Sequence, residues 1–242
     1  AVRPEGRITP GDLGLWRDEQ VAPLARVAAA IAAQGALPGI QLAHAWRKGG
    51  VAAPWEGGRA VPPAQGGWTP LGPGDEPFGP DHPAPRPMSP ADLAAVVAAF
   101  VAAARRAQRA GFRFVEIHAA HGYLLHEFLS PLVNRRDDGY GGAFESRARL
   151  LLETVTAVRA AWPDELPLWV RISATDWAEG GWDLPEAVRL AARLRAAGVD
   201  LVDCSSGGAV AHQRVALGPG YQVPFAERIR REAGARTGAV GL

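Results

Sequence analysis

The stretch Phe112-Arg-Phe-Val-Glu-Ile-His-Ala-Ala-His-Gly-Tyr-Leu124 contains the strongest indications of both fold and function in this chain. It follows Gly111, and glycine ends a helix at low cost because it has no Cβ atom. Aromatic and β-branched side chains then predict a buried strand. His118, His121 and Tyr123 come together where this strand ends. Two imidazoles and a phenol at the carboxyl end of a strand are suited to holding an oxygen atom and transferring a proton.

The composition excludes several classes of protein. The chain has 242 residues, enough for one domain with a sizeable core. Its 26 basic and 25 acidic side chains leave a net charge of +1, which predicts no nucleic-acid or membrane partner. Its one cysteine, Cys204, excludes an internal disulfide and fits a reducing compartment. No apolar run approaches the ~18–20 residues that span a bilayer, and the first residues do not resemble a secretion signal. We therefore expect a cytoplasmic enzyme.

The rest of the chain alternates the patterns of strands and helices. Strands are expected over residues 38–44, 112–118, 167–173, 199–205 and 238–242, and helices over 18–34, 89–110, 144–162, 185–197 and 224–233. This alternation predicts βα units and a parallel sheet.

Two architectures contain such a sheet, the doubly wound fold and the (β/α)₈ barrel. No Gly-x-Gly-x-x-Gly motif follows an expected strand, which weakens the case for a dinucleotide-binding doubly wound fold. The expected strands are also fewer than the eight of a closed barrel. The chain is therefore expected to form either an open sheet or a piece of a barrel.

A glycine- and proline-rich excursion occupies about residues 47–88. It is too long for an ordinary connector and too poor in apolar residues for a domain, so we expect a loop with a small hairpin. A disordered linker is the alternative. Trp55, Trp68 and Phe78 favour a loop that packs partly against the rest of the molecule.

Polar side chains on three expected strands share one face, because strand residues two apart point the same way. These same-face sets are Gln41 with Ala43, Glu116 with His118, and Trp169 with Arg171 and Ser173. In a barrel, Gln41, His118 and Arg171 would converge at the carboxyl end, where barrel enzymes have their active sites. A buried arginine requires a partner, so we expect Arg171 beside Glu116. A purely structural ion pair is the alternative role for Arg171.

The spacing His118-x-x-His121 leaves three interpretations open. The pair could bind a metal, belong to the hydrogen-bonded core, or bind a small molecule. No third metal ligand is evident, since Glu116 lies on the strand and His126 is five residues beyond His121. We favour small-molecule binding.

Two features surround the expected strand 199–205. Cys204 is expected to be a small core residue rather than a nucleophile. The segment Ser205-Ser206-Gly207-Gly208 follows the strand, and its backbone N–H groups could approach a flat or anionic ligand closely.

Seven segments in this order resemble consecutive motifs of the old yellow enzyme family. They are GRITPGDLGLW (6–16), GIQLAHAWRKGG (39–50), APWEGG (53–58), FVEIHAAHGYLLHEFLSPLVNRRDDGYGGAFESRARLLLETV (114–155), VRIS (170–173), VDLVDCSSGG (199–208) and GAVGL (238–242). The closer resemblance is to the bacterial ene-reductase branch, which includes NADPH dehydrogenases and xenobiotic reductases. The resemblance implies an FMN-containing (β/α)₈ TIM barrel. This chain would hold strands 3–6 and the start of strand 7, and would lack strands 1, 2 and 8.

The resemblance also implies a role for each candidate residue. Gln41 and Arg171 match side chains that contact the flavin ring. His118 and His121 match the pair that binds the substrate's carbonyl or nitro oxygen, and Tyr123 matches the catalytic proton donor. Ser205, Ser206, Gly207 and Gly208 match a cofactor-binding loop beside the flavin. The implied reaction is the reduction of an activated C=C bond, with NADPH or NADH as electron donor and no metal.

This chain departs from the family pattern in three places. Trp46 stands where the motif usually has glycine, which predicts a different turn or altered access above the flavin. Residues 75–82 fit the family poorly. The segments that would bind the FMN phosphate are expected to lie largely outside residues 1–242.

We therefore expect residues 1–242 to form one partial TIM-barrel flavin oxidoreductase domain. Its expected partners are a small-molecule alkene and a nicotinamide nucleotide, and a homo-oligomer remains open. The competing hypotheses are a metal-dependent TIM-barrel hydrolase that uses His118 and His121, and a barrel fragment without catalytic activity.

Overall fold

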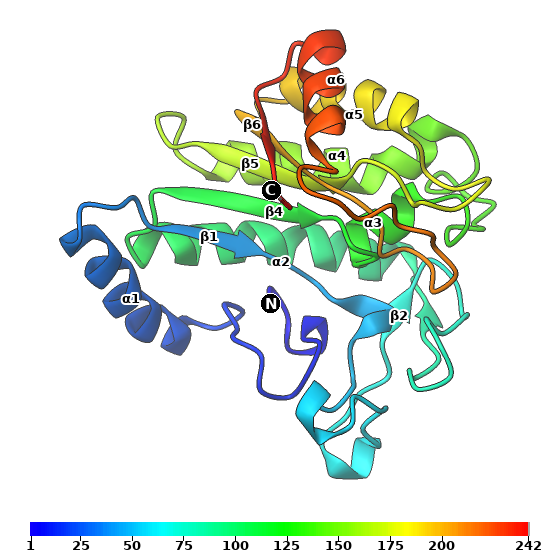
Figure 1. Cartoon of the computed structure of the whole chain (residues 1–242). Coiled ribbons are helices and arrows are strands. Elements are labelled where there is room, and N and C mark those ends of the chain that lie inside the picture. Colours follow the sequence, from blue (N-terminus) through cyan, green and yellow to red (C-terminus); the bar gives the residue numbers. More distant parts are fainter. Residues whose placement is uncertain (242) are drawn as a thin grey trace.

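The β-branched and aromatic runs form one parallel sheet of five strands (Figure 1). The structure is a computed structural model that describes residues 1–241. The strands are β1 (Gly39–Leu42), β4 (Phe114–Ala119), β5 (Leu168–Ser173), β6 (Leu201–Ser205) and β7 (Thr237–Ala239). They lie side by side in chain order, and every neighbouring pair is parallel, as the alternation of strands and helices predicts. The last expected strand extends to Leu242, which lies outside the described residues.

Five longer helices connect and flank these strands, each within a few residues of its expected range. They are α1 (Val21–Ala33), α2 (Pro90–Arg109), α4 (Phe144–Ala161), α5 (Leu184–Ala196) and α6 (Val223–Ala233). They contact one another in that order around the sheet. At the start of α2, the Ser89 hydroxyl accepts the Asp92 N–H and the Asp92 carboxylate accepts the Ser89 N–H. This capping box begins the helix where the Ser-Pro pair predicts.

The two faces of the sheet differ in burial, and this difference identifies the architecture. Outward-facing side chains such as Val115, Ile117, Val170 and Ile172 are fully buried under the helices. On the inner face Gln41 is exposed, and the side chains of its neighbours are only partly buried. A doubly wound sheet has helices on both faces, whereas a barrel has them only outside. The fold is therefore a (β/α)₈ barrel that is incomplete in this chain.

The excursion between β1 and α2 is ordered, so the alternative of a disordered linker is wrong. It contains β2 (Leu71–Gly72), β3 (Arg86–Pro87) and three short 3₁₀ helices, Trp46–Lys48, Pro54–Glu56 and Pro63–Gln65. Because β2 and β3 pair in parallel, the expected hairpin does not form there. The single antiparallel bridge within residues 1–241 joins Val51 and Ala60.

The aromatic side chains of the excursion behave differently from one another. The Arg7 guanidinium lies over the Trp68 ring at 4.8 Å, and the Lys48 ammonium lies over the Phe78 ring at 4.1 Å. The excursion thus packs partly against the rest of the molecule, as expected, but Trp55 takes no part in this packing because it is 86% exposed.

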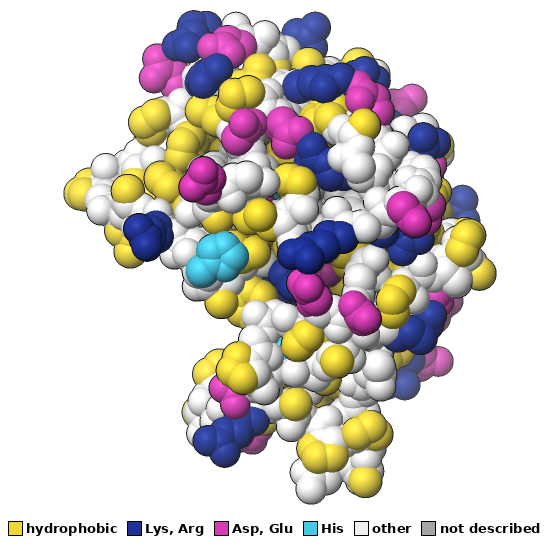
Figure 2. All heavy atoms as spheres, turned by 90° about the vertical axis from the view of Figure 1, so that its right-hand side faces the viewer, with side chains coloured by type: hydrophobic (Ala, Val, Ile, Leu, Met, Phe, Trp, Pro, Cys, Tyr) yellow, Lys and Arg dark blue, Asp and Glu magenta, His cyan; other side chains and the backbone are white. Residues whose placement is uncertain are grey.

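Basic and acidic side chains are interspersed over the face shown in Figure 2. Among the helices of the described chain, none combines the length and apolar character needed to cross a membrane.

Candidate active site

The inner face of the sheet places the candidate residues in rows set by strand register. Gln41 lies opposite Glu116, and Glu116 lies opposite Trp169. The next row holds His118, Arg171 and Asp203. Ser173 and Ser205 form a third row at the carboxyl end. His118 and Arg171 therefore approach the carboxyl end as predicted, whereas Gln41 lies one row farther from it.

The expected contact of Arg171 with Glu116 is wrong. The Arg171 Nε lies 3.3 Å from Asp203 Oδ2, because these two residues are opposite each other in register. Glu116 accepts a hydrogen bond of 2.6 Å from the Gln41 amide instead. Each polar side chain in the middle of this face thus has a partner on the neighbouring strand.

The structure brings His118 and His121 into direct contact. His118 Nε2 and His121 Nδ1 are 3.3 Å apart, and the ring planes are nearly perpendicular, at 84°. His121 Nε2 lies 2.6 Å from the Ser205 hydroxyl oxygen. The residues are thus close enough to share one bound oxygen, although in this structure their rings contact each other.

Both imidazoles are neutral near pH 7. Burial, helped by the neighbouring His121 ring and by the Arg171 charge, holds the pKa of His118 well below its usual range. Burial, helped by Arg171, lowers the pKa of His121 to about 4. The Ala120 N–H donates to His118 Nδ1 at 3.1 Å, so the single proton of the neutral His118 ring is on Nε2. That proton points toward His121, at the place where a ligand oxygen could accept it.

The turn that carries His121 is fixed by contacts on several sides. His121 has a left-handed backbone, with φ of 59°. Its N–H donates to the Ser173 hydroxyl at 2.9 Å, and its carbonyl accepts from Lys48 Nζ at 2.8 Å. Gly122 is also left-handed, and a Cβ atom there would collide with the Gly208 carbonyl. Because Gly122 and Gly208 both lack a Cβ atom, the two loops that carry them can pack backbone to backbone.

Tyr123 lies beside the histidine pair at the start of a short helix, α3 (Leu124–Leu129). Its ring meets the His118 ring edge to face, with centroids 4.9 Å apart. The Lys48 ammonium lies 5.9 Å from the Tyr123 ring centroid. Burial raises the pKa of the Tyr123 phenol above its usual value. The phenol is therefore protonated at neutral pH and able to donate.

The loop from Ser205 to Gly208 offers fewer free amides than the sequence suggests. The Gly207 N–H donates to the Thr175 carbonyl, and the Gly208 N–H donates to the Gln213 side chain. The Ser206 hydroxyl donates to Gln222 Oε1 at 2.7 Å. The N–H groups of Gly207 and Gly208 are therefore already used within the protein, and the close approach of a ligand to this loop stays a prediction. Gly208 instead permits close contact with the His121 turn, and Gly207 lies against Gln213 and Trp177.

The short helix α3 and its partners were not predicted from the sequence. All six of its residues are buried, including His126 and Glu127. Glu127 Oε1 lies 3.1 Å from Arg47 Nε, and His126 Nε2 lies 2.9 Å from Asp176 Oδ1. Charged residues within an apolar run are rarely buried without a partner. The run Leu-Leu-His-Glu-Phe-Leu therefore contains a signal for these pairs, but does not identify the partners.

Two other expected features concern Cys204 and Trp46. Cys204 is a buried core residue, as expected, and burial raises the pKa of its thiol to about 12.

Trp46 adopts φ of 59° and is fully buried, and the centroids of its indole and of the His44 ring are 4.6 Å apart. The turn at Trp46 is therefore left-handed, the conformation that glycine adopts most easily.

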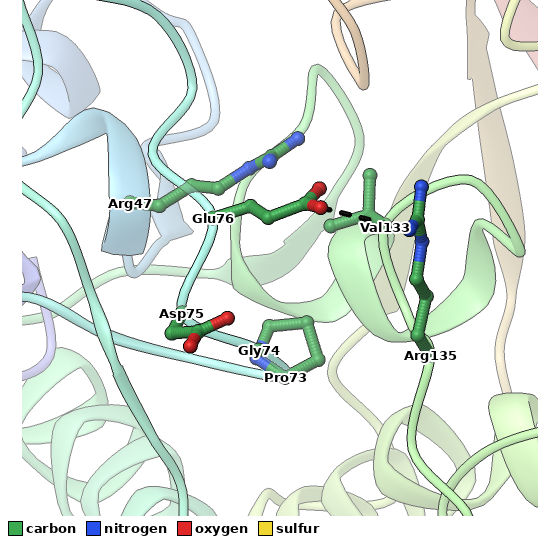
Figure 3. A pocket seen from close by; sticks show the side chains of 7 residues that line it. All are labelled: Arg47, Pro73, Gly74, Asp75, Glu76, Val133 and Arg135. Atoms are coloured by element: carbon green, nitrogen blue, oxygen red, sulfur yellow. Dashed lines mark ion pairs between the residues drawn. The ribbon is translucent and has the colours of Figure 1, made fainter.

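A small pocket of about 70 Å³ lies beside Arg47, between the excursion and the segment after α3 (Figure 3). Asp75 and Glu76 line it together with Arg47 and Arg135, and Glu76 pairs with Arg135 at 3.6 Å. Because charges of both signs line this pocket, it gives no clear preference for a phosphate.

The hypothesis of a metal-dependent hydrolase lacks a ligand set within residues 1–241. No three His, Cys, Asp or Glu side chains in that range gather closely enough to hold a metal ion. His118 Nδ1 already accepts a backbone N–H, which leaves only one of its nitrogens for a ligand.

The chain is similar to known flavin oxidoreductases over its described length. The model of a family described as "NADH:flavin oxidoreductase / NADH oxidase family" matches residues 1–241. An NADPH dehydrogenase of Geobacillus thermodenitrificans (strain NG80-2) is 48% identical over 241 residues, which are 100% of this chain and 66% of that relative. This chain thus spans just under two thirds of that relative's length.

Solved structures show the same similarity. The 2-naphthoyl-CoA reductase complex with 2-naphthoyl-CoA has a TM-score of 0.85 at 29% identity, covering 98% of this chain and 37% of the other. The old yellow enzyme homologue from Zymomonas mobilis has a TM-score of 0.80 at 25% identity, covering 100% of this chain and 66% of the other. The resemblance found in the sequence motifs is therefore confirmed.

Proposed function

Because the chain belongs to the NADH:flavin oxidoreductase / NADH oxidase family, we propose that it serves an FMN-dependent reduction of activated C=C bonds in α,β-unsaturated carbonyl or nitro compounds. The electron donor is NADPH or NADH. The observation that carries the proposal is the contact of two neutral histidines, at 3.3 Å, beside a protonated tyrosine. These groups lie at the carboxyl end of barrel strands, where this fold has its active sites.

The inner face of the sheet fits the ring of FMN. A flavin ring has hydrogen-bond donors and acceptors along one edge and a flat apolar remainder. Gln41 keeps an amide oxygen that does not bond to Glu116. Arg171 presents a partly buried guanidinium, whose Nε has Asp203 as its near partner among the described residues. We propose that Gln41 and Arg171 contact the ring edge, and that Ser205, Ser206, Gly207 and Gly208 lie beside the cofactor.

FMN held by Gln41 and Arg171 would supply hydride chemistry, with NADPH or NADH as the source of electrons. Hydride adds to the β-carbon of the substrate, and His118 and His121 act on the carbonyl or nitro oxygen at the other end of its conjugated system. As negative charge develops on the substrate oxygen, two preorganised N–H donors stabilise it. His118 contributes its Nε2–H. The Ser205 hydroxyl lies 3.3 Å from Gln222 Oε1 and 2.6 Å from His121 Nε2. When it turns from Gln222 and donates to His121 Nε2, His121 carries its proton on Nδ1 and contributes that N–H.

In that tautomer the two histidine N–H groups point at each other across 3.3 Å. Two donors that face each other are unfavourable, and an oxygen that accepts from both removes this conflict. The arrangement thus favours a carbonyl or nitro oxygen over an apolar group at this point.

Tyr123 supplies the proton that completes the reduction at carbon. Burial raises the pKa of its phenol, so Tyr123 holds its proton until hydride addition produces an enolate beside it. The Lys48 ammonium lies near the Tyr123 ring and is positioned to stabilise the phenolate that remains.

Other expectations from the sequence stay predictions. They are a cytoplasmic location, the absence of nucleic-acid and membrane partners, and a homo-oligomeric state. A small alkene and a nicotinamide nucleotide are the proposed partners.

Anaerobic single-turnover kinetics test the proposal. The protein with excess FMN is reduced by NADPH and then mixed with 2-cyclohexenone, while the return of oxidised flavin absorbance is followed. We expect the protein to accelerate this step over free reduced FMN, and His118→Ala to slow it ~10²- to 10³-fold, the usual effect of one lost oxyanion donor. A rate no higher than that of free reduced FMN would favour a fragment without catalytic activity.

A further inference from the structure

His126 and Asp176 form a buried pair behind residues 121–123, which are called the catalytic turn below. Neither side chain touches the open face of the sheet. Both side chains are fully buried. His126 lies on α3, and Asp176 lies three residues beyond the end of β5. Their closest atoms, His126 Nε2 and Asp176 Oδ1, are 2.9 Å apart. Within residues 1–241 neither atom has a hydrogen bond of good geometry, so the two groups meet as a close charge contact rather than as an aligned hydrogen bond.

The other ring nitrogen of His126 holds the backbone of the turn. The Gly122 N–H donates to His126 Nδ1 at 2.8 Å. Because Nδ1 accepts this hydrogen bond, the ring proton must be on Nε2, where it faces Asp176. His126 can therefore hold Gly122 in only one tautomer.

Asp176 is itself fixed on its far side. Its Oδ2 accepts from the Ser130 hydroxyl at 2.6 Å and from the Trp182 backbone N–H at 2.8 Å. Burial alone would raise the pKa of Asp176, but the nearby His126 ring and hydrogen bonds from Ser130 and the Trp182 backbone lower it overall. The carboxylate thus accepts two hydrogen bonds on Oδ2 and keeps Oδ1, 2.9 Å from His126 Nε2, as an acceptor beside the ring proton.

We propose that His126 and Asp176 are a positioning pair for the catalytic turn. Asp176 selects the His126 tautomer that binds the Gly122 amide, and that amide holds His121 and Tyr123 on either side of it at the place where the substrate oxygen binds. This inference rests on the proposed function, in which His121 binds the oxygen and Tyr123 donates the proton.

Asp176→Asn tests the role of the tautomer with little change in shape. The Trp182 N–H is a fixed backbone donor, so the new amide places its oxygen there and its NH₂ group against His126 Nε2. His126 must then accept at Nε2 and carry its proton on Nδ1, where it faces the Gly122 N–H. A buried amide that loses its acceptor is costly, so the turn is expected to shift.

A double-mutant cycle separates positioning from a general structural role. His126→Asn keeps an acceptor near the position of Nδ1 but has no tautomer to select. The readout is the Kd of phenol, a non-reducible oxygen ligand, for the protein loaded with excess FMN. We expect Asp176→Asn to weaken phenol about tenfold in the wild-type background and less than about threefold in the His126→Asn background. Ser130→Ala, which leaves the contact of Asp176 with His126 in place, serves as the matched control and should change the Kd less than about threefold.

An equal effect of Asp176→Asn in both backgrounds would overturn the proposal, because it would show that Asp176 acts independently of the tautomer. The FMN affinity of all variants is measured in parallel and should not change, since the pair does not line the inner face. If Asp176→Asn does not fold, the ¹⁵N chemical shifts of His126 in the wild-type protein decide the question.

The proposal requires a bare Nδ1 and a protonated Nε2 in those spectra, and the reverse would overturn it. Failure of the proposed function gives a different result. In that case wild-type protein would bind neither FMN nor phenol, whereas the tautomer of His126 would still be as described.

Discussion

Trp46 combines a left-handed backbone with a fully buried indole, and the two features have opposite effects on stability. A left-handed conformation costs ~1–2 kcal/mol for a residue that has a Cβ atom. Loss of a buried Trp side chain costs ~3–5 kcal/mol. The stabilisation from packing therefore exceeds the cost of the backbone strain, which explains how tryptophan is accommodated where the family motif usually has glycine.

Two substitutions at Trp46 separate packing from backbone strain. Trp46→Ala should lower the free energy of unfolding by ~3–5 kcal/mol, because it removes the ring and keeps the strained backbone. Trp46→Gly removes the same ring but relieves the strain, so it should be more stable than the alanine variant by ~1 kcal/mol. Urea unfolding of both variants measures the difference. If Trp46→Ala were more stable than Trp46→Gly, the backbone at this position would not be strained.

Single residues show what the sequence can and cannot predict about the site. The close approach of His118, His121 and Tyr123 was predictable, because a short spacing after one strand leaves little freedom. The pairing of Arg171 with Asp203 was not, because it depends on the register between β5 and β6. The partners of His126 and Glu127 lie on distant segments, so the sequence indicates only that partners are needed.

At the scale of elements, α3 supports the site and was the element least visible in the sequence. The βα units were predictable from their periodicity and their glycine ends. All six α3 residues are buried, so no polar face marks this segment as a helix. Strand ends were also imprecise: β1 ends at Leu42, two residues before the expected end at His44, because the chain turns toward Trp46.

The buried Glu127 of α3 makes stability depend on pH. Burial raises the pKa of Glu127 to about 8, although Arg47 and Lys48 oppose this shift. Below pH 4.5 the carboxyl is protonated in both folded and unfolded states. As pH rises from 4.5 toward about 8, the unfolded state releases its proton first and the folded state loses stability relative to it.

Glu127→Gln removes this titration. The variant should gain stability relative to wild type by up to ~1.4 kcal/mol per pH unit within that window, since one unit of pKa corresponds to this energy. Denaturant unfolding of both proteins across the window measures the trend. Parallel stability curves would show that Glu127 ionises normally in the folded protein.

At the scale of the whole molecule, the open inner face decides how a flavin can be held. Five parallel strands present Gln41 and Arg171 to a ligand, while helices cover only the outer face. Both side chains are expected to contact the ring. The Gly207 and Gly208 amides, which could otherwise bind a phosphate, are already hydrogen-bonded within the protein.

Residues 1–242 should therefore distinguish poorly between FMN and riboflavin, which differ by the phosphate. We expect the two Kd values to agree within about threefold, less than ~1 kcal/mol. Quenching of flavin fluorescence during titration gives both constants. A preference of about thirtyfold or more for FMN, ~2 kcal/mol, would place a phosphate site within these residues.

In the proposed function, one oxygen-binding histidine pair and one proton-donating tyrosine act at the end of β4. The most direct test is the Tyr123→Phe variant, compared with wild type on 2-cyclohexenone and on a nitroalkene. Addition of hydride to a nitroalkene gives a nitronate that is stable without a proton on carbon, whereas the enolate from an enone must be protonated.

Tyr123→Phe should therefore slow net reduction of the enone ~10²- to 10⁴-fold, the range for a lost general acid. Single-turnover hydride transfer to the nitroalkene should stay within about threefold of wild type, because the histidine pair remains intact. An unchanged enone rate, or an equal loss with both substrates, would contradict these roles for Tyr123 and the histidine pair.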